Sequence, residues 1–151
     1  MTDSLSPTSN QGSPPPVWAR KVFVMAGMAN IVTILVATRA FTDPLISQVD
    51  PTVFSTPGLV LIMVWGLAYL TIAPIWWKIP RMCLVFMLEK LVYVVCWILW
   101  ISKQHDQLPG LWDINWQIAL FYGGYGIVDT AFSFFFFWAW MTARKHSEMA
   151  S

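Results

Sequence analysis

Four long apolar runs constrain the fold of this chain more than any other feature of its sequence. The runs cover residues 17–40, 57–77, 81–101 and 114–141. Each is at least as long as the helix of roughly 20 residues that crosses the hydrocarbon core of a bilayer. A backbone in hydrocarbon must satisfy its own hydrogen bonds, so each run is expected to be helical. The sequence therefore predicts an all-α, polytopic membrane protein whose fold is a four-helix transmembrane bundle.

The low charge of the chain agrees with this prediction. Of its 151 residues, 57% are hydrophobic and only 11% are charged, whereas soluble domains carry about 25% charged residues. So few charges cannot cover the surface of a soluble globule. No basic patch indicates nucleic acid, and the expected partner is the lipid bilayer.

The chain divides into three parts by composition. Residues 1–16 are rich in Ser, Pro and Thr and end in three prolines, which predicts a disordered cytoplasmic tail with little to bury. Residues 17–143 form the expected membrane domain. Residues 144–151 are predicted to be a second cytoplasmic tail.

The basic residues predict the orientation of the bundle. Cytoplasmic segments carry an excess of Lys and Arg. One set of flanking segments holds Arg20, Lys21, Lys78, Arg81, Arg144 and Lys145, whereas the opposite loops hold Arg39 and Lys103 together with Asp43, Asp50, Asp106 and Asp113. The pattern predicts that both termini are cytoplasmic.

Polar and ionisable side chains interrupt the apolar runs at similar depths. Asn30, Glu89, Lys90 and Asp129 all lie well inside a run, where a central charge costs about 2.5 to 3.5 kcal/mol on insertion scales. Such groups face the bundle interior and pair there. Tyr69 lies at a matching depth, so all four helices contribute to one polar layer. The predicted site is this layer, and its candidate binding residues are Asn30, Tyr69, Glu89, Lys90, Tyr93 and Asp129.

The pairing within this layer has two possible forms. Consecutive helix residues do not face each other, so Glu89 and Lys90 each need a partner on another helix. The favoured pairing joins Lys90 to Asp129 and leaves Glu89 to Tyr69 or Asn30. In the alternative, Lys90 snorkels outward and Glu89 is protonated, because desolvation disfavours the charged carboxylate.

Small and aromatic residues share faces with this layer. Small residues that allow close helix approach form a stripe on the first run and flank Asp129 on the fourth, where Gly123 and Gly126 are expected to permit close packing. The stripe consists of Ala26, Ala29, Asn30, Thr33 and Ala37. With Trp65, Tyr69 and Tyr93, these faces predict an aromatic-walled polar pocket that opens toward the cytoplasmic half of the membrane.

No metal or cofactor is expected. His105 and His146 lie outside the apolar runs, with no cysteine or carboxylate at ligand spacing. Cys83 and Cys96 fall in one predicted helix, roughly 20 Å apart, which is too far for a disulfide. We interpret both as small buried residues.

Two short sequence segments and the architecture resemble a known family. Trp65-Gly66-Leu67-Ala68-Tyr69 and Phe86-Met87-Leu88-Glu89-Lys90-Leu91, with four crossings in a short chain, resemble the DoxX-like group of small bacterial membrane proteins. The resemblance covers the four helices in architecture only and assigns no functional residue. It implies a multi-pass protein of the bacterial inner membrane.

Three functions fit the sequence. In the first, buried charges fix helix register and small-residue faces pack against another membrane protein, as in an assembly partner. In the second, the polar layer binds or transports a small molecule or protons, in a homo-oligomer if it transports. In the third, least favoured, the chain is an enzyme that acts on an apolar substrate with a carboxyl as general acid. Sequence favours assembly slightly over binding or transport.

Overall fold

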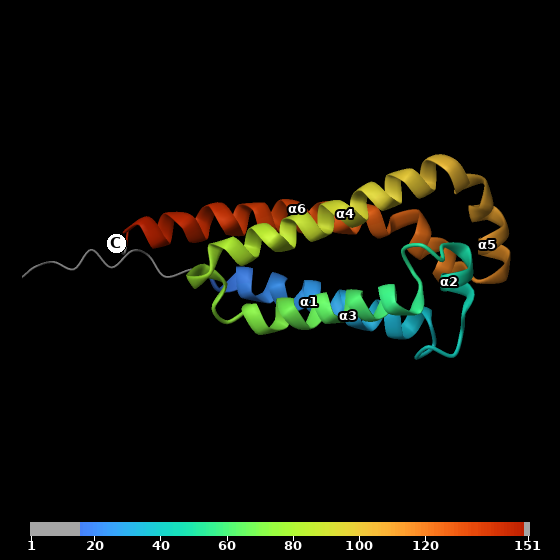
Figure 1. Cartoon of the computed structure of the whole chain (residues 1–151), viewed down its shortest axis with the longest axis horizontal. Coiled ribbons are helices and arrows are strands. Elements are labelled where there is room, and N and C mark those ends of the chain that lie inside the picture. Colours follow the sequence, from blue (N-terminus) through green and yellow to red (C-terminus); the bar gives the residue numbers. More distant parts are fainter. Residues whose placement is uncertain (1–15, 150–151) are drawn as a thin grey trace, which may run out of the picture.

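The computed structural model describes residues 16–149, and within them its regular elements are all helices (Figure 1). Four long helices alternate with short ones. The long helices are α1 (Val17–Ala37), α3 (Thr56–Ile72), α4 (Pro80–Gln104) and α6 (Trp116–Met149), and the short ones are α2 (Leu45–Val49), α5 (Leu108–Ile114) and the 3-10 helices η1 (Trp76–Lys78) and η2 (His105–Gln107). The predicted tail at 1–16 lies outside the described residues except for Pro16.

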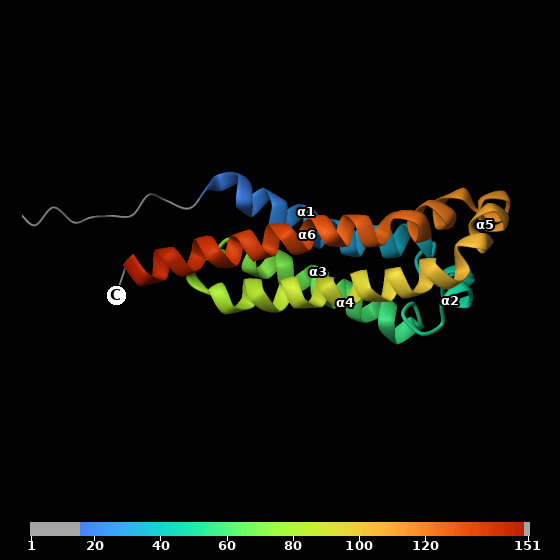
Figure 2. The same ribbon diagram turned by 90° about the horizontal axis from the view of Figure 1, so that it is seen from above.

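The long helices run alternately up and down as a two-layered bundle. α1 lies beside α3 in one layer and α4 beside α6 in the other (Figure 1). Seen from above, α6 lies over α1 and α4 over α3 (Figure 2). The connections α2 and α5 cover the end of the bundle remote from the C-terminus. We call this the loop end, and the opposite one the terminal end.

The all-α prediction is confirmed, together with helices of membrane-spanning length. Three segments are long and apolar enough to cross a membrane: Val17–Ala37, Pro80–Ile114 and Trp116–Glu148. The fourth long helix, α3, is apolar but has 17 residues, a length of about 26 Å.

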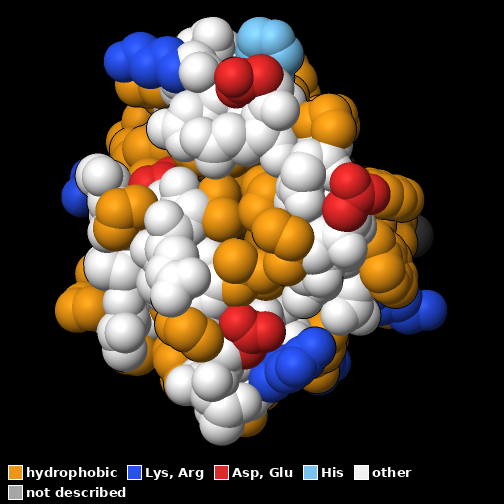
Figure 3. Space-filling view, turned by 90° about the vertical axis from the view of Figure 1, so that its right-hand side faces the viewer, with side chains coloured by type: hydrophobic (Ala, Val, Ile, Leu, Met, Phe, Trp, Pro, Cys, Tyr) orange, Lys and Arg blue, Asp and Glu red, His pale blue; other side chains and the backbone are white. Residues whose placement is uncertain are grey.

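The balance of basic and acidic residues differs between the two ends of the bundle. The antiparallel arrangement puts the six basic residues of the sequence prediction at or near the terminal end. Figure 3 looks onto the loop end, where acidic side chains and some basic ones lie around an apolar centre. The carboxylates of the loop end include those of Asp43, Asp106 and Asp113.

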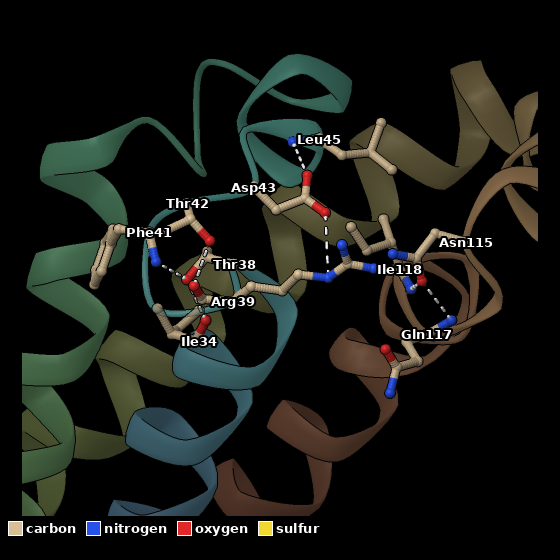
Figure 4. Close-up of polar contacts among 10 residues, drawn as sticks. All are labelled: Ile34, Thr38, Arg39, Phe41, Thr42, Asp43, Leu45, Asn115, Gln117 and Ile118. Atoms are coloured by element: carbon tan, nitrogen blue, oxygen red, sulfur yellow. Dashed lines mark hydrogen bonds and ion pairs between the residues drawn. The ribbon is translucent and has the colours of Figure 1, made fainter.

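α1 ends earlier than predicted, at Ala37, because the backbone turns left-handed. Arg39, Ala40 and Phe41 have φ angles of 48°, 55° and 67°, a conformation unfavourable for residues with a Cβ. Local bonds hold this turn: the Thr38 hydroxyl accepts from the Phe41 amide at 2.9 Å (Figure 4). The turn contains no glycine, so the sequence gives no signal that predicts it.

Two other helix ends also differ from prediction. α3 ends at Ile72 instead of residue 77, because Pro74 has no N–H to continue the ladder, and η1 follows. α6 continues to Met149, so residues 144–149 of the predicted tail are helical. Two contacts of Arg144 stabilise this extension. Its guanidinium nitrogen Nη2 lies 3.3 Å from Glu148 Oε1, and its Cζ lies 5.1 Å from the centroid of the Trp140 ring.

The backbones of α1 and α3 cross closely at two glycines. A Cβ at Gly27 would lie 2.7 Å from the Gly66 carbonyl oxygen, and a Cβ at Gly66 would lie 2.8 Å from that of Gly27. The small-residue stripe thus correctly indicated that α1 approaches another helix closely, but it did not include Gly27, the residue at the contact.

The glycines of α6 behave differently from each other. Gly126 packs directly on the Trp97 ring, where an added Cβ would lie 2.2 Å from a ring carbon. The prediction of close packing at Gly123 is wrong, because an added Cβ there would meet no other side chain within 4 Å.

The glycine crossing makes a testable prediction. Gly66→Ala should lower the free energy of unfolding by about 1 to 3 kcal/mol, because the new methyl group forces two backbones apart. Gly123→Ala, in open space, should leave stability unchanged or raise it by about 0.5 to 1 kcal/mol. Thermal unfolding in detergent, followed by circular dichroism, measures both variants. Equal stability of the two would contradict the close crossing.

Candidate functional site

The polar residues predicted to form one layer do meet inside the bundle. Asn30 comes from α1, Tyr69 from α3, Glu89 and Lys90 from α4, and Asp129 from α6. The first four are buried, and 14% of the Asp129 side chain is exposed. Each of the four long helices therefore contributes to the same cluster.

Lys90 lies at the centre of this polar cluster. Its ammonium group is 2.7 Å from Asp129 Oδ1 and donates to Asn30 Oδ1 at 3.0 Å. Glu89 Oε1 is 3.9 Å away, beyond hydrogen-bond distance. The favoured pairing of Lys90 with Asp129 is confirmed. The alternative in which Lys90 snorkels outward is wrong, because Lys90 is only 2% exposed.

Glu89 pairs with Tyr69, one of the two partners predicted for it. The Tyr69 hydroxyl donates to Glu89 Oε2. The other oxygen, Oε1, has no hydrogen-bond partner among the described residues. Asn30 is occupied elsewhere, since its amide donates to the Ile62 carbonyl at 3.1 Å.

These contacts connect all four long helices. Tyr69–Glu89 joins α3 to α4, Lys90–Asp129 joins α4 to α6, and Lys90–Asn30 reaches from α4 across the bundle to α1. The Lys90 ammonium also lies 5.6 Å from the Tyr69 ring centroid and 5.9 Å from that of Tyr93. Aromatic faces at this distance attract a desolvated cation.

A cavity of about 490 Å³ begins at this cluster and runs toward the loop end. Most of its wall comes from the second half of α1 and the first half of α6. The polar residues in the wall are Asn30, Thr33, Lys90, Tyr93, Gln117, Tyr125 and Asp129, and the apolar ones include Ala29, Phe54, Phe121, Gly124, Val128 and Phe132. A pocket therefore adjoins the polar cluster, but it lies on the loop side of the cluster, whereas the sequence predicts it on the side of the terminal end.

Packed aromatic rings explain why the cavity does not extend toward the terminal end. Phe136 contacts Phe23, Tyr69 and Phe86, with ring centroids 5.2, 4.9 and 5.5 Å apart. Trp76 stacks on Phe23 at 6.0 Å, and all five rings are at most 1% exposed. We call these five residues the aromatic plug. It fills the space in which the sequence predicts a pocket.

Not every predicted site residue reaches the cavity. Asn30, Lys90, Tyr93 and Asp129 line it, whereas Tyr69 and Glu89 do not. Tyr69 belongs to the aromatic plug, and Glu89 is bonded to it. Trp65 also stays outside and packs edge-on against Phe86 at 6.3 Å.

Tyr125 and Gly124 are among the wall residues that were absent from the predicted set. Tyr125 is 9% exposed, and its hydroxyl has no hydrogen-bond partner within residues 16–149. Gly124 leaves open space, since an added Cβ would meet nothing within 4 Å. The helical spacing of Gln117, Phe121 and Tyr125 with Asp129 was the available signal for this face. In the described part of the chain, no three metal-ligating side chains gather into a metal site.

No family model, curated protein or solved structure matches this chain. The DoxX-like resemblance therefore stays a prediction based on architecture.

The buried ion pair makes a prediction about stability. Lys90→Met leaves Asp129 without its cation, and loss of one partner of a buried pair costs about 3 to 5 kcal/mol. Lys90→Met combined with Asp129→Leu should recover most of that loss, because no unpaired charge remains. Tryptophan fluorescence during thermal unfolding in detergent compares the variants. A double variant as unstable as the single one would contradict this account.

Proposed function

We propose that this chain is a multi-pass membrane protein that binds a small, mainly apolar molecule in the cavity between α1 and α6. The observation that carries the proposal is the continuity of an apolar-walled cavity with a buried cluster of ionisable groups. Binding sites for small molecules combine concave apolar walls with a few convergent polar groups. Ionisable groups at membrane depth also mark substrate and ion paths.

The proposed topology has four crossings and cytoplasmic termini. α3 runs antiparallel to α1 and α4 within the same bundle, so a membrane crossed by its neighbours also surrounds α3. Its length of about 26 Å is close to the roughly 30 Å of hydrocarbon. Basic residues at the terminal end support a cytoplasmic location for that end. The proposed location is a bacterial inner membrane.

The aromatic plug favours binding over conduction. A path for ions or protons must continue across the bundle, whereas the cavity stops at Lys90 and the plug fills the layer beyond it. A molecule that enters from the loop half must therefore leave by the same side. The cavity is complete within one chain, so binding needs no second copy.

The wall of the cavity favours entry from the lipid. Thr33 on α1 and Leu120 and Val128 on α6 line the cavity and are exposed on the surface of the bundle. They lie along the boundary between α1 and α6. These two helices contact each other far less than α1 and α3 do. An opening at this depth faces acyl chains, which selects a molecule that already partitions into the membrane.

The assembly function expected from the sequence receives no comparable support. The small residues that would form a face for another protein pack inside the bundle instead, at the Gly27–Gly66 crossing and in the cavity wall. The exposed side chains of α4, such as Leu88, Val92 and Val95, suit lipid contact as well as protein contact. For an enzyme, the described residues offer no further reactive group beside the polar cluster.

The topology can be tested with single cysteines in a background of Cys83→Ala and Cys96→Ala. Gln107→Cys at the loop end should react with a membrane-impermeant maleimide added to intact cells. Ser147→Cys near the end of α6 should react only after permeabilisation. Gel-shift labelling reads both. The reverse pattern would invert the proposed orientation, and labelling of both sites in intact cells would refute it.

The cavity can be tested by filling it. Gly124→Leu adds a side chain to open cavity space. The amount of bound molecule that copurifies with the protein should therefore fall at least about tenfold, which corresponds to a loss of 1.4 kcal/mol of binding free energy. Gly123→Leu is the matched control, because Gly123 also has open space around it but does not line the cavity. Mass spectrometry of solvent extracts, normalised to protein, gives the occupancy. Equal occupancy in both variants, or none in the unmodified protein, would refute the proposal.

A further inference from the structure

Asp129 presents an unused hydrogen-bond acceptor to the cavity. Its Oδ1 atom pairs with the Lys90 ammonium at 2.7 Å, whereas Oδ2 has no hydrogen-bond partner among residues 16–149. Unlike the unpaired oxygen of Glu89, Oδ2 is not enclosed by protein atoms, and 14% of the Asp129 side chain is exposed. Because Asp129 lines the cavity, a molecule in the cavity can reach this oxygen.

The donors beside this oxygen are less accessible. The Lys90 side chain is 3% exposed, and two of its three N–H groups are taken by Asp129 and Asn30. Asn30 is buried and donates to the Ile62 carbonyl at 3.1 Å. The Tyr125 hydroxyl is unpaired, but protein atoms enclose it. At this end of the cavity a bound molecule therefore meets the Asp129 acceptor more readily than a donor.

The charge of Asp129 makes its carboxylate the strongest acceptor in the wall. Tyr93, Thr33 and Gln117 also line the cavity and can accept a hydrogen bond, but their oxygens are neutral. Hydrogen bonds to an ionised acceptor are roughly twice as strong as those between neutral groups. An acyl chain has no donor, so lipid in the cavity would leave Oδ2 unpaired. A ligand with a donor therefore has an advantage over lipid.

The charges around Asp129 favour a neutral donor. The Lys90 ammonium already balances the Asp129 carboxylate, so a second cation on the same carboxylate would lie close to that ammonium. Glu89 lies 3.9 Å from the ammonium but does not line the cavity, so it offers a cation no contact. An anion would face the exposed carboxylate. A neutral molecule also enters the lipid at a much lower cost than an ion.

We infer that the ligand of the cavity is a neutral, largely apolar molecule with an N–H or O–H group, and that this group donates a hydrogen bond to Asp129 Oδ2. This inference rests on the proposed function and names the ligand class of the same site. The two oxygens of Asp129 then have different roles. Oδ1 holds Lys90 in the polar cluster, and Oδ2 selects the ligand.

Three rigid probes of nearly equal shape test the inference: carbazole, fluorene and 9-fluorenone. At the same place in the central ring, carbazole has an N–H donor, fluorene a CH₂ group and 9-fluorenone a carbonyl acceptor. Binding is measured to the full chain in nanodiscs, with empty nanodiscs of the same lipid subtracted to remove partitioning. The unmodified protein should prefer carbazole to both other probes by about tenfold or more, the scale of one hydrogen bond to a charged group.

Asp129→Asn tests the acceptor itself. The new amide oxygen should take the place of Oδ1 beside the Lys90 ammonium, which leaves the NH₂ group to face the cavity. The variant should therefore prefer 9-fluorenone to carbazole. If it does not fold, Lys90→Met combined with Asp129→Leu removes the same oxygen and leaves no unpaired charge. This double variant should bind carbazole and fluorene equally well.

Asp106→Asn is the matched control, because it makes the same chemical change on an exposed carboxylate that does not line the cavity. It should keep the full preference for carbazole. Tyr93→Phe removes another acceptor from the wall. A carbazole preference that disappears in Tyr93→Phe and persists without the Asp129 carboxylate would assign the hydrogen bond to Tyr93 and overturn the inference.

The outcomes separate the inference from the proposed function. Equal binding of carbazole and fluorene to the unmodified protein, or a carbazole preference unchanged by loss of the Asp129 carboxylate, would overturn the inference alone, provided that Gly124→Leu weakens fluorene binding. If none of the three probes binds the unmodified protein, or if Gly124→Leu binds all three equally well, the proposed function fails and the inference fails with it.

Discussion

The buried ammonium group of Lys90 is the constraint on which the arrangement of the bundle depends. A charge within an apolar bundle is tolerated only where its partners are fixed. Asp129 and Asn30 provide those partners from α6 and α1, and Tyr69 holds the neighbouring Glu89 from α3. Sliding or rotating any one helix would separate one of these pairs. The cluster therefore selects one register among the many that apolar surfaces alone would permit.

The two halves of the bundle differ because different side chains fill them. On the terminal side of Lys90, large rings such as Phe23, Phe136 and Trp76 close the interior. On the loop side, small residues such as Ala29 and Gly124 occupy the facing surfaces of α1 and α6 and leave space between them. The cavity therefore results from side-chain volume on two helices, while the polar cluster fixes the point at which it stops.

Sequence alone predicted the features set by strong local physics. Ionisable residues at equal depth predicted the polar layer, and the adjacency of Glu89 and Lys90 predicted that each would pair across helices. Features set by tertiary packing were not predicted. The direction of the cavity depends on how the rings of the aromatic plug meet, and the left-handed turn at Arg39 to Phe41 forms without glycine. Gly27 was overlooked because one glycine among small residues gives no signal until its neighbour is known.

A ligand of a cavity that opens to lipid, as proposed for this one, must displace acyl chains from it. This competition decides what selectivity at such a site requires. Acyl chains are abundant and match apolar walls, so hydrophobic contact gives a ligand little advantage over them. Discrimination must come from groups that a hydrocarbon leaves unpaired, because a site built to hydrogen-bond its ligand rejects analogues that lack the partner far more strongly than it rejects a change in apolar size. The partly exposed carboxylate of Asp129 in the cavity wall is a group of this kind. On this proposal, the polar cluster serves both as the register of the bundle and as the source of its selectivity against lipid.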